Sequence, residues 1–197
     1  MPTIECDPTV AADRLQKAGI EVHEGNTDHE RWRAETDGAT AIGYDDVVVV
    51  QGRNPMEIES LLREKGGLVH LYFDGASRGN PGPAAIGWVL VDSDGIVAEN
   101  SRRIGRATNN EAEYEALIEG ISTAARFGYD RIEIRGDSEL IVKQVTGEYN
   151  TNAPSLRERR VRALEALQAF ENWTITHVPR AVNERADELA NNALDST

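Results

Sequence analysis

Runs of strand-forming residues open the longer, C-terminal part of the chain. They predict strands over 68–74, about 84–92 and 96–103, and Asp94-Gly95 supplies a hairpin turn between the last two. We therefore expect an antiparallel meander of three strands.

Helical and strand patterns then alternate toward the C-terminus. The stretch TNNEAEYEALIEGISTAARFG predicts a helix that Asn109 or Asn110 caps and Gly128 ends. After it come a strand, two helices, a strand and a final helix: YDRIEIRGDS, SELIVKQVTG, PSLRERRVRALEALQAF, WTITHVP and NERADELANNAL. This order is typical of an α/β fold with a mixed sheet flanked by helices. Trp88 and Trp173 lie in strand patterns, so we expect both in the core; aromatic platforms for stacking are the alternative.

The first 67 residues predict a smaller unit. Its elements are a helix at about 8–18, short strands near 20–23 and 30–36, a hairpin in ATAIGYDDVVVVQG and a helix at about 54–65. The glycines of LREKGG (62–67) separate that helix from the strand that begins at Leu68. We expect a small α+β domain over 1–67 and a larger domain over 68–197.

Composition adds a strongly acidic surface to this picture. The 197 residues carry a net charge of −13, and only three of the 21 basic residues are lysine. This balance is typical of halophilic proteins, because the Debye length falls to about 3 Å at 1 M salt. An ordinary acidic mesophilic protein is the alternative. The charge argues only weakly against a nucleic-acid partner, because high salt also weakens phosphate attraction to basic residues.

The location of the protein is expected to be cytoplasmic, without a membrane partner. No apolar run approaches the roughly 18 residues of a membrane span. The first residues, MPTIECDPTV, lack the basic and apolar regions of a signal peptide. Cys6 is the only cysteine, which excludes an internal disulfide and argues against a thiolate zinc site.

Four acidic residues fall where this layout brings the chain to one rim of the sheet. Asp74 ends the first strand and Asp137 follows RIEIRG. Glu113 is expected in the first turn of its helix, and Asp187 lies four residues after Asn183 in the last helix. Oxygen ligands select Mg²⁺ or Mn²⁺ over zinc, and two such ions about 4 Å apart clamp an in-line phosphoryl displacement. Each residue taken alone could equally be one of 34 surface acids. The four together favour a cation site.

Four segments that contain these acids resemble the motif blocks of ribonuclease HI in order and spacing: YFDGASRGNPGPAAIGWVL, TNNEAEYEAL, RGDSELIV and HVPRAVNERADELA. The resemblance covers about 68–194. It implies a ribonuclease H-like fold with a five-stranded mixed sheet flanked by helices. It also implies an endoribonuclease that hydrolyses the RNA strand of RNA/DNA hybrids with two Mg²⁺ or Mn²⁺ ions, leaving 5′-phosphate and 3′-hydroxyl ends.

The resemblance assigns a role to each acid. Asp74 would bridge both metals, and Asp187 would help to hold the ion that activates the attacking water. Glu113 and Asp137 would hold the ion that faces the leaving 3′-oxygen.

Two further residues match auxiliary catalytic positions of the family. His177 matches a mobile-loop histidine that assists proton transfer or product release; an ordinary surface histidine is the alternative. Glu184 matches an acid near the water-activating metal, although the helix dipole alone could also account for a first-turn acid.

Backbone and amide groups close to these acids are candidate substrate contacts: Gly75, Asn80, Thr108, Asn109 and Asn110. They could bind phosphates, base edges or the 2′-hydroxyl that distinguishes RNA from DNA. The asparagines could instead serve only as turn and cap residues. We expect Gly75 to let a sugar–phosphate backbone come close.

The chain departs from the family at the DNA grip. Some members carry a basic, tryptophan-rich protrusion between the two middle helices, where this chain has only TGEYNTNAP. The nearby arginines at 157, 159, 160 and 162 are interpreted first as a solvated helix face and second as backbone contacts.

Residues 1–67 are then the candidate source of extra affinity for the substrate. Solubilising, dimerising and protein-docking roles are the rivals. The hairpin and helix of this segment are similar, over a short stretch, to the TATA-binding-protein-like N-terminal domain of ribonuclease HIII.

Two other functions compete with hybrid hydrolysis. A nuclease of the same fold could prefer double-stranded RNA or RNA–DNA junctions, whose minor groove is similar. The second alternative is a nucleic-acid-binding module without catalytic activity. The intact set of four acids argues against it.

Overall fold

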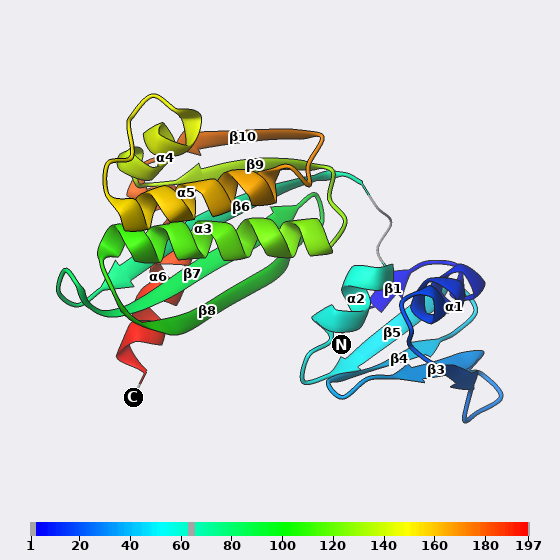
Figure 1. Cartoon of the computed structure of the whole chain (residues 1–197). Helices are drawn as coiled ribbons and strands as arrows, with labels where there is room; N and C mark the ends of the chain where they lie inside the picture. The colour runs from blue at the N-terminus through cyan, green and yellow to red at the C-terminus, as the bar shows by residue number, and fades with distance from the viewer. Residues whose placement is uncertain (1–2, 63–65, 197) are drawn as a thin grey trace. The chain divides into compact units, whose positions relative to one another are not determined.

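The computed structural model describes residues 3–62 and 66–196, and the chain divides into two compact units between Lys65 and Gly66 (Figure 1). Each unit has its own five-stranded sheet. Residues 63–65, which belong to the predicted helix at 54–65 and to the LREKGG seam, lie outside the described residues.

The N-terminal unit is a fully antiparallel sheet with two helices. Its elements are β1 (Thr3–Glu5), α1 (Pro8–Lys17), β2 (Val22–Glu24), β3 (Trp32–Glu35), β4 (Ala39–Gly43), β5 (Val47–Gly52) and α2 (Met56–Leu62). The strand order is β1-β5-β4-β3-β2. Strand β1 was not predicted, because three residues that pair only with β5 carry too short a pattern to recognise.

The core of this unit lies on one face of its sheet. Val48 and Val50 of β5 are buried against Leu15 of α1 and Ile58 of α2. The alternate residues Val47 and Val49 are only half-buried. Both helices therefore cover the same face, as a period-two strand pattern requires.

The C-terminal unit contains a mixed sheet of five strands: β6 (Leu68–Ser77), β7 (Gly82–Asp92), β8 (Gly95–Ala107), β9 (Arg131–Gly136) and β10 (Asn172–His177). The order is β10-β9-β6-β7-β8. The meander β6–β7–β8 is antiparallel, and β9 pairs in parallel with both β6 and β10. The predicted mixed five-stranded sheet is confirmed.

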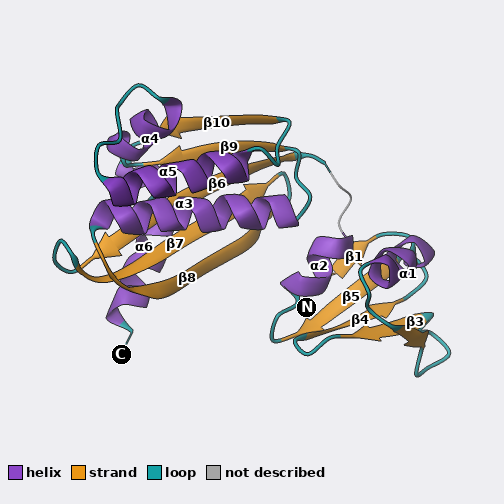
Figure 2. Ribbon diagram, in the orientation of Figure 1, coloured by secondary structure: helices purple, strands orange, loops and turns teal. Residues whose placement is uncertain are grey.

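The helices of this unit are α3 (Asn109–Arg126), α4 (Glu139–Thr146), α5 (Pro154–Leu167) and α6 (Glu184–Asp195), and a 3-10 turn (Arg180–Val182) precedes α6. Helices α3 and α5 lie together on one face of the sheet and α6 lies on the other (Figure 2). Helix α6 comes so close because Gly87 of β7 has no side chain; a β-carbon there would overlap the backbone of Ala186 and Ala190. No described helix is long and apolar enough to cross a membrane.

The two tryptophans predicted in this core have different environments. Trp88 on β7 is 2% exposed, as predicted, and its indole Nε1 donates to Glu119 Oε1 at 3.1 Å. Trp173 is 37% exposed, so its prediction is wrong. The reason is that β10 forms the edge of the sheet, where a strand pattern does not ensure burial.

Candidate active site

Asp74 lies inside strand β6 and not at its end. Pairing with β7 continues beyond it, through Ala76 opposite Ala85 and Ser77 opposite Ala84. The prediction that Asp74 ends the strand is therefore wrong. Asp74 is 7% exposed and is paired with Gly87, so it points to the face that α6 covers. Its position on the central strand holds the carboxylate in a fixed orientation.

The other three acids come from three different elements. Asp137 directly follows β9, and Asp187 lies in the first turn of α6. Glu113 begins the second turn of α3, one turn later than predicted, because the helix starts at Asn109. All four carboxylates line one cleft, together with Gly75, Ala76, Ser77, Arg78, Asn109, Arg180, Asn191 and Leu194.

The carboxylates of this cleft perturb one another. Burial raises the pKa of Asp74 to about 8, and the nearby Asp137, Glu113 and Asp187 reinforce the shift. Burial also raises the pKa of Glu113 to about 7, against the lowering effect of hydrogen bonds from Ser138 and Asn109. The site thus favours added positive charge, supplied either by protons or by a cation.

Asn183 is a buried residue that orients the Asp137 carboxylate, and it was not predicted as a functional residue. It is 1% exposed, and its Nδ2 donates to Phe73 O at 2.8 Å and to Asp137 Oδ1 at 2.9 Å. It thereby ties β6 to the segment after β9. Its place one helical turn before Asp187 in the sequence was the only available signal.

Arg180 is the second residue that the sequence did not reveal. Its Nη2 donates to Asp187 Oδ1 at 2.6 Å, and the pair partly neutralises one side of the cleft. No three His, Cys, Asp or Glu side chains among the described residues are spaced as a formed metal site. The donor set nevertheless fits a hard cation, since it consists of carboxylate oxygens that repel one another.

The predicted auxiliary residues lie at the margin of the cleft. His177 is exposed, and its Nε2 lies 3.2 Å from the backbone oxygen of Asp137. Glu184 is exposed at the first position of α6. Neither belongs to the described lining, so the structure brings the four main acids together and leaves these two outside.

Position 75 requires glycine for a different structural reason from the one predicted. It is buried, and a β-carbon there would overlap the backbone of Ala112 and Glu113. The missing side chain therefore makes room for α3 rather than for a nucleic-acid backbone. This contact brings Glu113 toward Asp74.

The polar candidates around the start of α3 divide into caps and cleft residues. Thr108, and not Asn109 or Asn110, caps the helix in a reciprocal capping box with Glu111. Asn109 Nδ2 donates to Glu113 Oε1 at 2.8 Å, and Asn80 Oδ1 accepts from the backbone N–H of Asn109 at 3.2 Å. Asn110 is the second helical residue and does not line the described cleft.

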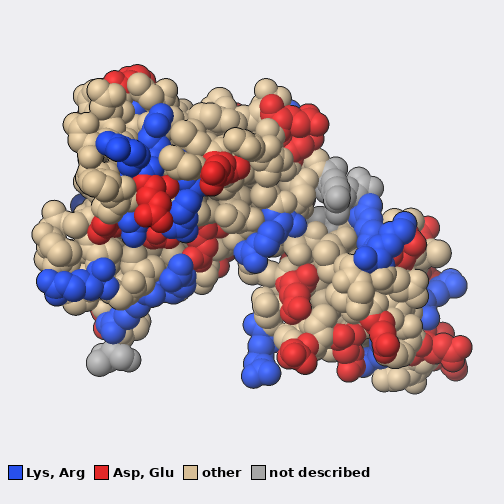
Figure 3. All heavy atoms as spheres, viewed as in Figure 1, with Lys and Arg blue, Asp and Glu red and all other residues tan. Residues whose placement is uncertain are grey.

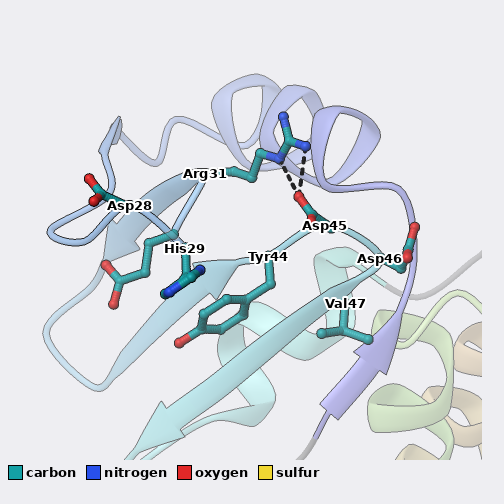
Figure 4. A pocket seen from close by; sticks show the side chains of 8 residues that line it. Asp28, His29, Arg31, Tyr44, Asp45, Asp46 and Val47 are labelled. Atoms are coloured by element: carbon teal, nitrogen blue, oxygen red, sulfur yellow. Dashed lines mark hydrogen bonds and ion pairs between the residues drawn. The ribbon is translucent and has the colours of Figure 1, made fainter.

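The N-terminal unit has a hollow of its own, formed by its 28–31 and 44–47 segments (Figure 4). Four of its lining residues are acidic: Asp28, Glu30, Asp45 and Asp46. Arg31 is held by Asp45, with a nitrogen–oxygen distance of 2.6 Å. This charge repels phosphate, so the hollow is not suited to a nucleic-acid backbone.

Comparison with known proteins identifies the family. A reverse transcriptase-like family model matches residues 72–193. Ribonuclease HI of Halobacterium salinarum is 58% identical over 197 residues, which span 99% of each chain and hence both units. A bifunctional protein of Mycobacterium tuberculosis is 42% identical over 125 residues, or 62% of this chain and 34% of that protein.

Solved structures agree with this assignment. The crystal structure of RNase H1 from the halophilic archaeon Halobacterium salinarum is 67% identical, with a TM-score of 0.65 over 66% of this chain and 100% of that chain. LC11-RNase H1, solved in complex with an RNA/DNA hybrid, is 42% identical, with a TM-score of 0.61 over 64% of this chain and 96% of that chain. The chain belongs to the ribonuclease HI family and is a ribonuclease H.

Proposed function

We propose that the chain hydrolyses the RNA strand of RNA/DNA hybrids with two divalent cations, Mg²⁺ or Mn²⁺, and leaves 5′-phosphate and 3′-hydroxyl ends. The observation that carries this proposal is the convergence of four carboxylates from four elements on one cleft. The raised pKa of Asp74 supports it, because the ionised carboxylate is unfavourable in this site and a bound cation would stabilise it. LC11-RNase H1, a relative at 42% identity, was solved with such a hybrid.

Each carboxylate has a distinct task in this proposal. Asp74, fixed on the central strand, would be shared between both ions, with Asp187 on one side and Glu113 and Asp137 on the other. The bound cations would lower the pKa of a water molecule and stabilise the charge on the attacking and leaving oxygens. Asn183 holds the Asp137 carboxylate through its Nδ2, and Asn109 holds Glu113. These amides keep the ligands oriented while the substrate binds.

His177 and Glu184 are proposed as auxiliary groups. An exposed imidazole beside the Asp137 backbone can reach a departing group and then turn to solvent, which suits proton transfer or product release. Glu184 is exposed and lies one helical turn before Asp187 on the same side of α6, where it could orient a water molecule.

The substrate is proposed to be contacted, next to the cleaved phosphate, by Asn80, Thr108, Asn109, Asn110 and the backbone of Gly75. The Asn80–Asn109 hydrogen bond joins the loop after β6 to the start of α3, so their remaining polar groups form one surface. Such groups can bind a phosphate or a 2′-hydroxyl without a positive charge.

The N-terminal unit is proposed to add affinity for the substrate or to dock a partner. Its independent core and the matching of both units by the Halobacterium salinarum relative support a separate module. Residues 66–197 alone should then bind hybrid more weakly than the full chain. Equal affinity would refute the substrate-binding role.

The activity is tested with end-labelled RNA/DNA hybrid, duplex RNA, an RNA–DNA junction and duplex DNA. Wild type and Asp74→Asn are compared in Mg²⁺ and in Mn²⁺, at low and at high salt. We expect wild type to cut the RNA of the hybrid, and Asp74→Asn to be inactive. The 5′ ends should accept label from a kinase only after phosphatase treatment.

Three results would contradict the proposal. A wild type that cuts none of the four substrates at either salt refutes the enzyme. A preference for duplex RNA or for the junction refutes hybrid specificity. Undiminished cleavage by Asp74→Asn refutes the assignment of the site.

A further inference from the structure

The loop between β6 and β7 contributes a cationic side chain to the cleft. Arg78 of this loop and Arg180 are the only Lys or Arg residues in the described lining. Arg180 bonds Asp187, which is one of the four carboxylates of the site. Arg78 pairs instead with Asp195, which does not line the cleft. Arg78 is therefore the cation of the cleft whose partner lies outside the site.

The backbone of this loop holds Arg78 in a fixed place. The backbone N–H of Arg78 donates to Pro83 O at 2.8 Å, and Ser77 Oγ donates to Ala107 O at 2.8 Å. A β-carbon at Gly82 would overlap the backbone oxygen of Arg78, so the loop is tightly folded against itself. Arg78 can therefore change its partner by a movement of its side chain alone.

The partner of Arg78, Asp195, is an unfavourable acid at its position in α6. It is the last residue of the helix, where the negative end of the helix dipole disfavours a carboxylate. The helix end is secured separately by Arg103, whose Nε donates to Ala193 O at 3.1 Å and whose Nη2 donates to Leu194 O at 2.5 Å. Opening of the Arg78–Asp195 pair would thus leave the end of α6 in place.

The Arg78–Asp195 ion pair is of a kind that opens readily. Its two side chains are 64% and 57% exposed. Exposed pairs contribute little to stability, and salt weakens them further. A guanidinium can bind a phosphate through two parallel hydrogen bonds, and a nucleic-acid backbone carries a denser negative charge than one exposed carboxylate. A phosphate in the cleft can therefore displace Asp195.

The local charge of the cleft favours such a phosphate although the whole chain is acidic. Two divalent cations would balance the four carboxylates, so the lining would keep the positive charge of its two arginines. Basic side chains also gather along β8 and around the β6–β7 loop (Figure 3). The exposed arginines of β8 are Arg102, Arg103 and Arg106. The net charge of −13 is therefore not the charge that a phosphate meets here.

We propose that Arg78 exchanges Asp195 for a phosphate of the bound RNA strand, next to the phosphate that is cleaved, and that Asp195 competes with the substrate for this arginine. The inference rests on the proposed hybrid substrate. The two residues then control affinity in opposite directions, because Arg78 binds the substrate and Asp195 holds Arg78 back. A purely structural ion pair would behave differently, since the loss of either partner breaks the same bond.

The test measures the Kd of a fluorescently labelled RNA/DNA hybrid by anisotropy. It uses the full chain in Mg²⁺, with Asp74→Asn in every variant so that the RNA stays intact. Arg78→Gln should raise Kd about fivefold or more, and Asp195→Asn should lower it about threefold. The gain from Asp195→Asn should shrink as salt rises, because salt already weakens the competing ion pair. In the Arg78→Gln chain, Asp195→Asn should no longer change Kd.

Arg185 and Glu99 provide the matched control pair. Their nitrogen–oxygen distance is 2.6 Å, both are partly exposed, and neither belongs to the described lining. Arg185→Gln and Glu99→Gln change the net charge in the same way as the test variants, so they measure the general effect of charge on hybrid binding. Their effects on Kd should be smaller than those of Arg78→Gln and Asp195→Asn.

Three results would overturn the inference. They are a Kd that Asp195→Asn raises or leaves unchanged, an effect of Asp195→Asn that persists in the Arg78→Gln chain, and test effects no larger than those of the control pair. Thermal unfolding checks that the variants fold. Arg78→Lys replaces Arg78→Gln if the latter does not fold, and it should also raise Kd because lysine lacks the two-bond geometry. A wild type that cuts no hybrid refutes the proposed function itself, whereas cleavage with unchanged Kd values refutes only this contact.

Discussion

Replacing Asp74 by asparagine should stabilise the metal-free protein. The Asp74 carboxyl is 7% exposed, and its pKa is about 8 in the folded chain against an ordinary value of 3.8. At pH 7 this difference corresponds to at most about 4 kcal/mol of lost stability, at 1.36 kcal/mol per pKa unit. Relaxation of the site and screening by salt reduce the effect, so we expect Asp74→Asn to gain about 2 kcal/mol.

The pH dependence of this gain has a definite sign. The folded chain keeps the Asp74 proton up to about pH 8, whereas the unfolded chain loses it near pH 4. The folded state therefore binds more protons between these values, and wild-type stability falls as pH rises through this window. The advantage of Asp74→Asn should be absent below pH 4 and largest at pH 8 and above.

Urea unfolding in EDTA, repeated from pH 4 to pH 9, measures this advantage, with the transitions of the two units fitted separately. Asp94→Asn is the control: Asp94 is exposed in the β7–β8 turn, where Asn-Gly is equally suitable, so its effect should stay within about 0.5 kcal/mol. Saturating Mg²⁺ should stabilise wild type and reduce the gap. If Asp74→Asn is no more stable than wild type at pH 8 without metal, the argument from burial and repulsion is wrong.

Three further substitutions test the parts that position the site. Asn183→Ala removes the donor to Phe73 O and Asp137 Oδ1, so the free energy of unfolding measured in urea should fall by about 1–3 kcal/mol, and kcat should fall as well. An unchanged kcat would show that Asp137 does not need this hydrogen bond. Gly75→Ala forces α3 away from β6, and calorimetry should show a loss of about 3 kcal/mol, whereas Ala76→Gly, its neighbour, should cost far less. His177→Ala should lower kcat about a hundredfold without changing hybrid affinity in a binding titration, and a wild-type kcat would remove His177 from the mechanism.

The sheet was predictable because its signals are local. The Asp94-Gly95 turn and the alternating residues of the meander specify neighbouring strands, and parallel pairing follows once a helix separates β6 from β9. The end of β6 was not predictable in this way. The strand continues beyond the Asp74 carboxylate until Ser77 pairs with Ala84, and the strand propensities of single residues do not predict this continued pairing.

The cleft was predictable only through the carboxylates that the family motifs contain. Asn183 and Arg180 act through contacts with residues far away in sequence, such as the hydrogen bond from Asn183 to Phe73. The cap of α3 was misassigned for a related reason. Thr108, Asn109 and Asn110 are all acceptable caps, and the Glu111 side chain selects Thr108 by completing the capping box.

The acidic composition and the proposed substrate become compatible when charge is considered site by site. A net charge of −13 opposes hybrid binding at long range, but this repulsion is screened within about 3 Å at 1 M salt. At contact distance, the cleft would bind phosphate through cations held by its carboxylates. This contact requires no basic protrusion. Raising salt should therefore weaken hybrid binding by this chain less steeply than binding by a family member that grips DNA with many lysines.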